Sequence, residues 1–195
     1  MTQPTLETSR LVLAPLADEH LELEVELDSD PEVMRHLGGY ARSRVETEEA
    51  HKRRRRAGQK VPGLGFWVGF VHGEFVGWWI LQPPRGPDQP DVDGEAELGY
   101  RLLRKFWRLG YAREGARELI RYGFAEVGLT RIFAQTLAVN RASRATMTSA
   151  GLTFAREFAS SESIPGAEHG EVEYEITRDT YESVHVAGGT HSGRT

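Results

Sequence analysis

Apolar residues recur along this chain at two spacings, and each spacing is typical of a different secondary structure. Runs and alternations with a period of two predict strands at Leu11–Leu16, Phe66–Val71, Glu74–Leu81, Glu95–Leu102, Arg131–Val139, Leu152–Ala159 and Val172–Thr177. Helical spacing and capping residues predict helices at Asp18–Leu27, from Asp30 onward, at Ser43–Ala57, between Gly110 and Gly128, and at Ala142–Ala150. Helices are interspersed among strands without a regular strand–helix–strand repeat. The pattern therefore predicts an α/β (α+β) fold with a mixed, mostly antiparallel sheet.

Residues with special turn and capping chemistry set several boundaries of these elements. Asp30-Pro31 combines an N-cap residue with a proline at the first helical position, and Ser43 with Glu46 forms a capping box. His72-Gly73 separates two apolar runs and predicts a tight hairpin. The segment Gln82–Asp93 contains four prolines and a glycine, so we expect an exposed loop there.

Length and composition describe one globular domain. The chain has 195 residues, 39% hydrophobic and 27% charged, and no apolar window is long enough for a membrane helix. Cysteine is absent, which excludes disulfides, a thiol nucleophile and a thiolate zinc site. The N-terminus lacks the pattern of a signal peptide, so we expect a cytoplasmic protein. The formal net charge of −5 argues against nucleic acid as the main partner, and the composition of residues 183–195 predicts a disordered tail.

The segment Gly94–Glu114 carries the clearest functional signal. An alternating strand runs directly into Trp107–Ala112, and an amphipathic helix follows. The first turn of a helix has backbone N–H groups without partners and carries partial positive charge. Gly110 lacks the Cβ that would keep a phosphate away from the backbone. This arrangement predicts a cofactor that bears a diphosphate.

A second element sharpens this hypothesis. Asn140-Arg141-Ala142-Ser143 follows the predicted strand Arg131–Val139 and opens another helix, which ends at Gly151. Further characteristic segments are Thr8–Leu13, Asp30–Arg35 and Phe75–Trp78. Together these segments resemble the GNAT acyltransferases, and within them the Rim-type N-acetyltransferases that modify protein amino termini. The resemblance extends from about Glu7 to about Tyr181 and implies a single GNAT domain over residues 7–181.

The resemblance also implies a site for acetyl-CoA. In GNAT proteins the strands that correspond to Glu95–Leu102 and Arg131–Val139 splay apart, and the pantetheine arm of acetyl-CoA lies in the gap. The implied cofactor-binding residues are Tyr100, Arg101 and Leu102 through their main chain, Arg108, Leu109, Gly110, Tyr111, Ala112 and Arg113 in the turn, and Asn140 and Ser143. Trp107 stands where most family members carry Gln or Arg, and Rim-type members commonly carry Trp there.

Several of these assignments have a plain structural alternative. Asn140 is also a preferred N-cap residue, and capping is compatible with cofactor contact because the residue lies where a strand end meets a helix start. Arg108 and Arg113 are candidates for charge-assisted contacts to phosphate oxygens, but solvated side chains would explain them too.

Acyl transfer from a thioester to an amine needs a group that takes the proton of the amine. Glu97 is the candidate base, with Glu95 on the same face in reserve, although solvated strand carboxylates would look the same. Many GNAT enzymes use a tyrosine acid seven residues after the asparagine, where this chain has Met147. Ser143 is the candidate acid or hydrogen-bond donor to the leaving thiolate, or else a helix-start serine bonded to backbone. No metal is required, because a thioester is already activated.

The resemblance implies an N-acetyltransferase that moves an acetyl group from acetyl-CoA to a primary amine by direct attack in a ternary complex. The acceptor is a protein N-terminus or a small molecule, and the alternatives are an antibiotic or metabolite acetyltransferase and a CoA-binding sensor without catalysis. Glu171, Glu173 and Tyr174 are candidates for the wall of the acceptor pocket. No membrane partner is expected, and a homodimer is compatible with the sequence.

Two further segments bear on the site. The basic run His51–Arg56 covers all faces of a helix, so we predict a solvated helix end in preference to a site for RNA or for a phosphate of CoA. Trp78 and Trp79 are adjacent on a predicted strand, so their rings lie on opposite faces of the sheet. One ring is then expected in the core, and the other is a candidate for the acceptor cleft.

Overall fold

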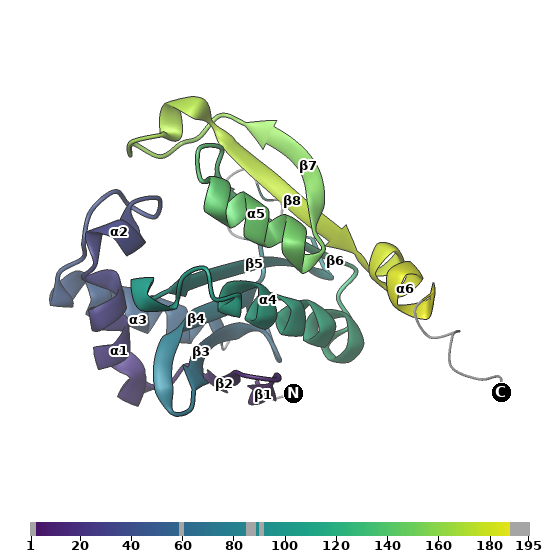
Figure 1. The fold of residues 1–195 in the computed structure, drawn as a ribbon, viewed down its shortest axis with the longest axis horizontal. Coiled ribbons are helices and arrows are strands. Elements are labelled where there is room, and N and C mark those ends of the chain that lie inside the picture. Colours follow the sequence, from purple (N-terminus) through teal and green to yellow (C-terminus); the bar gives the residue numbers. More distant parts are fainter. Residues whose placement is uncertain (1–2, 59–60, 85–88, 90–91, 188–195) are drawn as a thin grey trace.

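The computed structural model describes residues 3–58, 61–84, 89 and 92–187. Its centre is an eight-stranded sheet with the order β1-β2-β3-β4-β5-β6-β8-β7 (Figure 1). The strands are β1 (Leu6–Glu7), β2 (Val12–Pro15), β3 (Gly65–Val71), β4 (Glu74–Gln82), β5 (Glu95–Leu102), β6 (Arg131–Leu137), β7 (Thr153–Phe158) and β8 (Glu171–Thr177). Neighbouring strands are antiparallel except β5 and β6, which are parallel. The predicted mixed, mostly antiparallel sheet is confirmed.

The helices divide between the two faces of this sheet (Figure 1). They are α1 (Leu21–Asp28), α2 (Pro31–Met34), α3 (Arg44–Gly58), α4 (Tyr111–Tyr122), α5 (Arg141–Ala150) and α6 (Arg178–Ala187). Leu27 of α1 and Ala57 of α3 share one apolar cluster with Trp78 of β4. Leu119 of α4 and Met147 of α5 share the other cluster with the strand residues on the opposite face. No helix of the described residues combines the length and apolarity that a membrane span requires.

Capping and turn residues predicted several element boundaries correctly. The side chain of Asp30 accepts a hydrogen bond from the N–H of Glu32 at the start of α2 (2.9 Å). The carboxylate of Glu46 accepts from the N–H of Ser43 (2.8 Å), which confirms the capping box at the start of α3. His72-Gly73 has left-handed φ values of 51° and 81°, as a tight hairpin between β3 and β4 requires.

Other boundaries differ from the prediction. α4 passes into a π-helical turn, Gly123–Val127, before Gly128 ends it with a φ of 87°. β6 ends at Leu137, two residues before the predicted end. Helix α6 extends to Ala187 and so includes residues 183–187, which we predicted as the beginning of a disordered tail. The remaining tail, 188–195, lies outside the described residues, as do positions 85–88 and 90–91 of the predicted loop.

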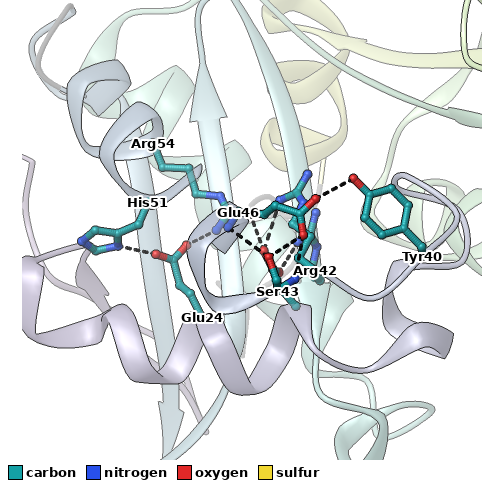
Figure 2. A network of polar contacts seen from close by, with 9 residues as sticks. Glu24, Tyr40, Arg42, Ser43, Glu46, His51 and Arg54 are labelled. Atoms are coloured by element: carbon teal, nitrogen blue, oxygen red, sulfur yellow. Dashed lines mark hydrogen bonds and ion pairs between the residues drawn. The ribbon is translucent and has the colours of Figure 1, made fainter. Parts of the chain in front are cut away.

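The basic run in α3 is not a solvated helix end throughout, and the prediction is wrong for two of its members. His51 and Arg54 are only 4% and 8% exposed. They lie on the buried face of α3, where each contacts the fully buried Glu24 of α1 (Figure 2). Charged side chains become buried in this way when a partner of opposite charge is available to them.

Candidate active site

The gap predicted between two strands is present. β5 and β6 pair over only three positions, from Glu95–Arg131 to Glu97–Phe133. Beyond Glu97, β5 continues to Leu102 without a strand partner on this side among the described residues. Unpaired strand edges present backbone donors and acceptors that bind extended ligands. The gap therefore fits a chain that carries amide groups.

The turn between β5 and α4 presents a row of backbone N–H groups. Arg108 and Gly110 both have left-handed φ values, 61° and 86°. The first helical hydrogen bond runs from the N–H of Glu114 to the carbonyl oxygen of Gly110 (3.0 Å), so the N–H groups of residues 111–113 have no helical acceptor. A Cβ at Gly110 would lie 3.3 Å from Nη2 of Arg10. The turn fits a diphosphate, which requires a close approach to such N–H groups.

Arg10 belongs to this turn, although sequence reasoning did not identify it as a site residue. Its guanidinium bonds Glu114 of α4 (Nε to Oε2, 2.6 Å) and the carbonyl oxygen of Leu109 (3.0 Å), and it lies 4.4 Å from the centroid of the Tyr111 ring. Arg10 is 104 residues from Glu114 in sequence, so no local spacing could have connected them. Arg10 adds a cation to the turn and fixes the first turn of α4.

Glu114 is a carboxylate held by the N-terminal segment. It accepts hydrogen bonds from the hydroxyls of Thr8 (2.6 Å) and Ser9 (3.0 Å) in addition to those from Arg10. Burial alone would raise the pKa of Glu114, but the hydrogen bonds from Thr8, Arg10 and Ser9 outweigh it and hold that pKa below its ordinary value. The segment before β2 is thereby joined to the helix that begins the turn.

The other residues predicted in the turn lie at its surface. A Cβ at Gly110 would lie 3.8 Å from Nη2 of Arg113, while the side chain of Arg108 is exposed. The indole N–H of Trp107 donates to the carbonyl oxygen of Leu102 (2.8 Å), so Trp107 ties the turn to the end of β5. Both arginines therefore lie beside the turn that the diphosphate fits.

Asn140 caps α5. Its Oδ1 accepts from the N–H of Ser143 (3.2 Å), and its Nδ2 donates to the hydroxyl of Thr136 (3.1 Å). The predicted capping is confirmed, and both ends of the amide have a partner within the protein. A cofactor contact by Asn140 would therefore replace or share the bond to Thr136 on β6.

Tyr100 and Ser143 meet across the gap. The hydroxyl of Tyr100 donates to the carbonyl oxygen of Ser143 (3.1 Å) and lies 3.3 Å from its Oγ. Burial raises the pKa of Tyr100 to about 12, against the opposing effect of its hydrogen bonds. The phenol is therefore protonated at neutral pH and acts as a donor. Sequence reasoning assigned only the main chain of Tyr100 to the site.

Glu97 lies on the opposite face of β5 from Tyr100, since odd and even positions of a strand alternate. Its carboxylate accepts a hydrogen bond from Nε2 of Gln82, its neighbour on β4 (2.9 Å). The reserve candidate, Glu95, forms an ion pair with Arg131 (2.8 Å).

Two cavities open on the face of Glu97, one on each side of it. One, of about 260 Å³, is lined by Arg42, Ala50, Arg53, Arg54, Phe66, Trp78, Ile80, Gln82 and Arg101. The other, of about 270 Å³, is lined by Pro84, Gln89, Val92, Glu95, Arg131, Phe133, Arg156 and Glu173. The strand neighbours of Glu97 are Gln82 and Phe133, so each cavity includes one of them. Glu97 is therefore positioned between two hollows that can receive an acceptor.

The residues suggested for the acceptor wall divide between the two faces. Glu173 lines the second cavity but is 3% exposed and forms ion pairs with Arg131 (2.6 Å) and Arg156 (2.8 Å). Tyr174 packs in the cluster beneath α4 and α5, on the other face. The carboxylate of Glu171 accepts a hydrogen bond from Ser160 (2.6 Å). Glu173 alone among these three contributes to a cavity wall.

The adjacent tryptophans lie as the alternation predicts. Trp79 is fully buried in the cluster beneath α4, and its indole N–H donates to the carbonyl oxygen of Ala112 (3.1 Å). Trp78 lines the first cavity, on the face of Glu97. Among the described residues, no group of three or more histidine or acidic side chains could hold a metal ion.

The sequence matches the Acetyltransferase (GNAT) domain family over residues 10–153. This match covers more than half of the chain. The chain belongs to the GNAT acetyltransferases. As a GNAT enzyme it is an acetyl-CoA-dependent N-acetyltransferase, and the open strand edge of β5 and the free N–H groups at the start of α4 suit the pantetheine and diphosphate of that cofactor.

Individual GNAT relatives agree with this assignment. The chain is 45% identical over 185 residues to the FsC-acetyl coenzyme A-N(2)-transacetylase of Aspergillus fumigatus, covering 92% of this chain and 78% of the relative. It is 29% identical to the uncharacterized N-acetyltransferase YoaA of Bacillus subtilis, and this match covers 72% of this chain and 77% of YoaA. Two solved structures share the fold. A GNAT-family acetyltransferase from Bacillus anthracis has a TM-score of 0.73 at 22% identity, with 90% and 99% covered. RimL, a ribosomal L7/L12 alpha-N-protein acetyltransferase in complex with coenzyme A, has a TM-score of 0.75 at 19% sequence identity, and the match covers 92% of this chain and 99% of RimL.

Proposed function

We propose that this enzyme acetylates a primary amine of a small molecule, and that the acceptor enters on the face of Glu97. The observation that carries the proposal is the position of Glu97 between two cavities, opposite the face on which Tyr100 contacts Ser143. The relative with 45% identity, which is named as an N(2)-transacetylase, supports a small-molecule acceptor. The Rim-type alternative, a protein N-terminus, is supported by the sequence resemblance that includes Trp107 and by likeness of fold.

The cofactor site that we propose has two parts. The N–H groups at the start of α4, with Gly110 as the close-approach position, receive the diphosphate, and Arg10, Arg108 and Arg113 supply positive charge. The open backbone edge of β5 from Tyr100 to Leu102 receives the pantetheine amides. When bound, acetyl-CoA supplies an acetyl group already activated as a thioester.

The chemistry follows from the two faces of β5. The amine approaches from the cavities, and Glu97 accepts its proton directly or through one water molecule as the new C–N bond forms. The C–S bond breaks, and the hydroxyl of Ser143 donates a hydrogen bond to the leaving sulfur, which receives its proton from solvent. Tyr100 keeps Ser143 in place from β5. A base and a thiolate donor on opposite faces of β5 allow direct transfer without a covalent enzyme intermediate.

The test is a comparison of two acceptor classes. Purified enzyme with acetyl-CoA is offered a panel of small primary amines and a panel of short peptides with free N-termini, and thiol release is followed together with mass spectrometry of the products. We expect kcat/KM for the best small amine to exceed that of the best peptide by at least about tenfold. Acetylation confined to peptide N-termini would instead establish the Rim-type activity. A cytoplasmic location and a homodimer remain predictions of the sequence.

A further inference from the structure

The cavity between α3 and the first half of the sheet has an unusual charge. Among the residues that the structure describes, every charged side chain that lines it is an arginine: Arg42, Arg53, Arg54 and Arg101. The apolar part of its wall is formed by Phe66, Trp78 and Ile80. A cavity with cationic and aromatic walls selects an anionic group and disfavours the bare ammonium end of an acceptor.

The carboxylates that hold these arginines lie behind them. Glu24 and Asp28 of α1 are fully buried and do not line the cavity. Arg54 bonds Glu24, as Figure 2 shows, and it also bonds Asp28. Arg42 (3.1 Å) and Arg101 bond Asp28 as well. Three guanidinium groups thus face two carboxylates, which leaves one positive charge in excess even when His51 is neutral. The network is preorganised and still positive toward the cavity.

Two buried donors of this wall have no acceptor among the described residues. They are the indole Nε1 of Trp78 and the Nε of Arg101. Each residue is 7% exposed, and the Arg101 guanidinium lies 4.8 Å from the centroid of the Trp78 ring. Buried donors are nearly always hydrogen-bonded, so a pair of unsatisfied donors in the wall of a cavity indicates a ligand oxygen.

The wall leads directly to the candidate base. Trp78 of β4 pairs with Arg101 of β5. Four residues away along each strand, on the same face of the sheet, Gln82 pairs with Glu97. Between these two pairs, on the same face, Ile80 pairs with Gly99, so β5 contributes no side chain at that position. Four residues of strand span about 13 Å between Cα atoms, and the two side chains shorten the distance between their charged ends. An acceptor along this path has its amine and its anionic group separated by several bonds.

We propose that this cavity, the arginine cavity, binds a carboxylate of the acceptor through Trp78 Nε1 and Arg101 Nε while the amine reaches Glu97. The inference rests on the proposed function and makes it specific: the substrate class is an amino acid or amino-acid derivative in which several bonds separate the amine from the carboxylate. The buried Asp28 holds Arg101 through an ion pair, and the guanidinium of Arg101 lies over the ring of Trp78, so the two donors are side by side.

The test uses matched acids and amides. The enzyme saturated with CoA is titrated calorimetrically with glycine, γ-aminobutyrate and ε-aminocaproate, and with the carboxamide of each. We expect at least one of the two longer acids to bind about tenfold or more tightly than its amide. Equal affinities within each pair, or no measurable binding of any acid, would overturn the proposal.

Variants separate the donors from the fold. Trp78→Phe removes an N–H that has no acceptor within the described part of the chain. The protein should therefore remain folded, the acid should lose its advantage, and binding of the amide should be unaffected. Arg101→Lys keeps a charge beside Asp28 but loses Nε, and Arg104→Lys, outside the cavity, is its control. An unchanged acid-to-amide ratio in Trp78→Phe would contradict the assignment. Thiol release with the amides as acceptors tests the proposed function separately. If the amides are acetylated as fast as the acids, the enzyme acetylates small amines as proposed, and only the carboxylate site is contradicted.

Discussion

The hydroxyl of Tyr100 on β5 lies 3.1 Å from the carbonyl oxygen of Ser143 and 3.3 Å from its Oγ, and so joins the strand to α5 across the gap between β5 and β6. The side chain of Asn140 accepts from the N–H of the same serine (3.2 Å). Ser143 is thus held at its N–H and its carbonyl, and its hydroxyl is within hydrogen-bond distance of Tyr100 as well. A donor fixed in this way loses little entropy when it meets a developing thiolate.

Ser143→Ala should therefore lower kcat with little change in the affinity for CoA. A hydrogen bond to a charged group contributes about 1.5–3 kcal/mol, which corresponds to a loss of roughly tenfold to one-hundredfold. Tyr100→Phe keeps the serine hydroxyl and should cost less, and the double variant should cost less than the sum of both. Steady-state kinetics and calorimetric titration of CoA measure the two quantities. A larger effect of Ser143→Ala on CoA affinity than on kcat would reduce this residue to a binding role.

Glu97→Gln and Glu95→Gln distinguish the two candidate bases. Loss of a general base typically lowers the rate by about 10²–10⁴-fold, and we expect this for Glu97→Gln near neutral pH. Glu95→Gln should leave kcat nearly unchanged, because the Glu95 carboxylate is bound to Arg131 (2.8 Å). The profile of kcat/KM against pH for both variants is the measurement. The opposite order of effects would assign the base to Glu95. Two active variants would mean that the amine arrives from solution already deprotonated and attacks the thioester without help from either carboxylate.

Gly110→Glu should abolish the binding of acetyl-CoA, because it places a side chain and a negative charge at the start of α4. The chain offers a matched control at the other end of that helix. Gly128 has the same left-handed conformation, with φ values of 87° and 86° for the two glycines, and a Cβ there would meet nothing within 4 Å. Gly128→Glu therefore introduces the same backbone strain and charge away from the turn. Calorimetry should detect micromolar binding in the control only, and equal affinities would move the diphosphate elsewhere.

The elements set by local chemistry were predictable from the sequence. The Ser43–Glu46 capping box, the His72-Gly73 hairpin and the cap by Asn140 each depend on residues no more than a few positions apart. The turn at Gly110 follows the same rule, since a strand, a glycine and a helix start are adjacent in the chain.

Contacts over long sequence separations were not predictable in this way. His51 contacts Glu24 over a separation of 27 residues, and Arg54 contacts Asp28 over 26. The sequence of α3 by itself shows only a run of basic residues, and such residues are usually exposed to solvent. Arg10 contacts Glu114, beside the turn at Gly110, over a separation of 104 residues, and Tyr100 contacts Ser143 over 43. The arginine cavity depends on such contacts and has no signature in the sequence.

Gly115→Ala tests the packing that fixes α4. Alanine in a helix interior is normally favoured over glycine by about 1 kcal/mol. Here a Cβ would lie 2.5 Å from Cε2 and Nε1 of the buried Trp79, so we expect a net destabilisation of about 1–3 kcal/mol in denaturant unfolding. Trp79→Leu should be destabilising by itself, and adding Gly115→Ala to it should cost little more. Additive effects of the two substitutions would contradict a shared contact.

Asp28 links the stability of the fold to the arginine cavity. Burial alone would raise its pKa, but the guanidinium groups of Arg101 and Arg54 outweigh burial and hold that pKa below its ordinary value. A carboxylate with a lowered folded pKa contributes its full stabilisation above the unfolded pKa of about 3.9 and loses it as the pH falls through the folded value. Asp28→Asn should therefore reduce the free energy of unfolding by about 3–5 kcal/mol at neutral pH, because two buried guanidinium groups lose their carboxylate.

The difference between Asp28→Asn and the wild type should shrink as the pH falls below about 4. There the Asp28 carboxyl of the unfolded wild-type chain takes up a proton, while the folded carboxylate, with its lowered pKa, takes one up only at lower pH. Urea unfolding of both proteins across this range is the measurement. Glu48→Gln is the control, since Glu48 forms an exposed pair with Arg44 (3.1 Å) and such pairs contribute at most about 1 kcal/mol. A difference between Asp28→Asn and the wild type that stays constant with pH would mean that shape and not charge determines the effect. Packing, and not the charge of Asp28, would then position the arginines that line the cavity.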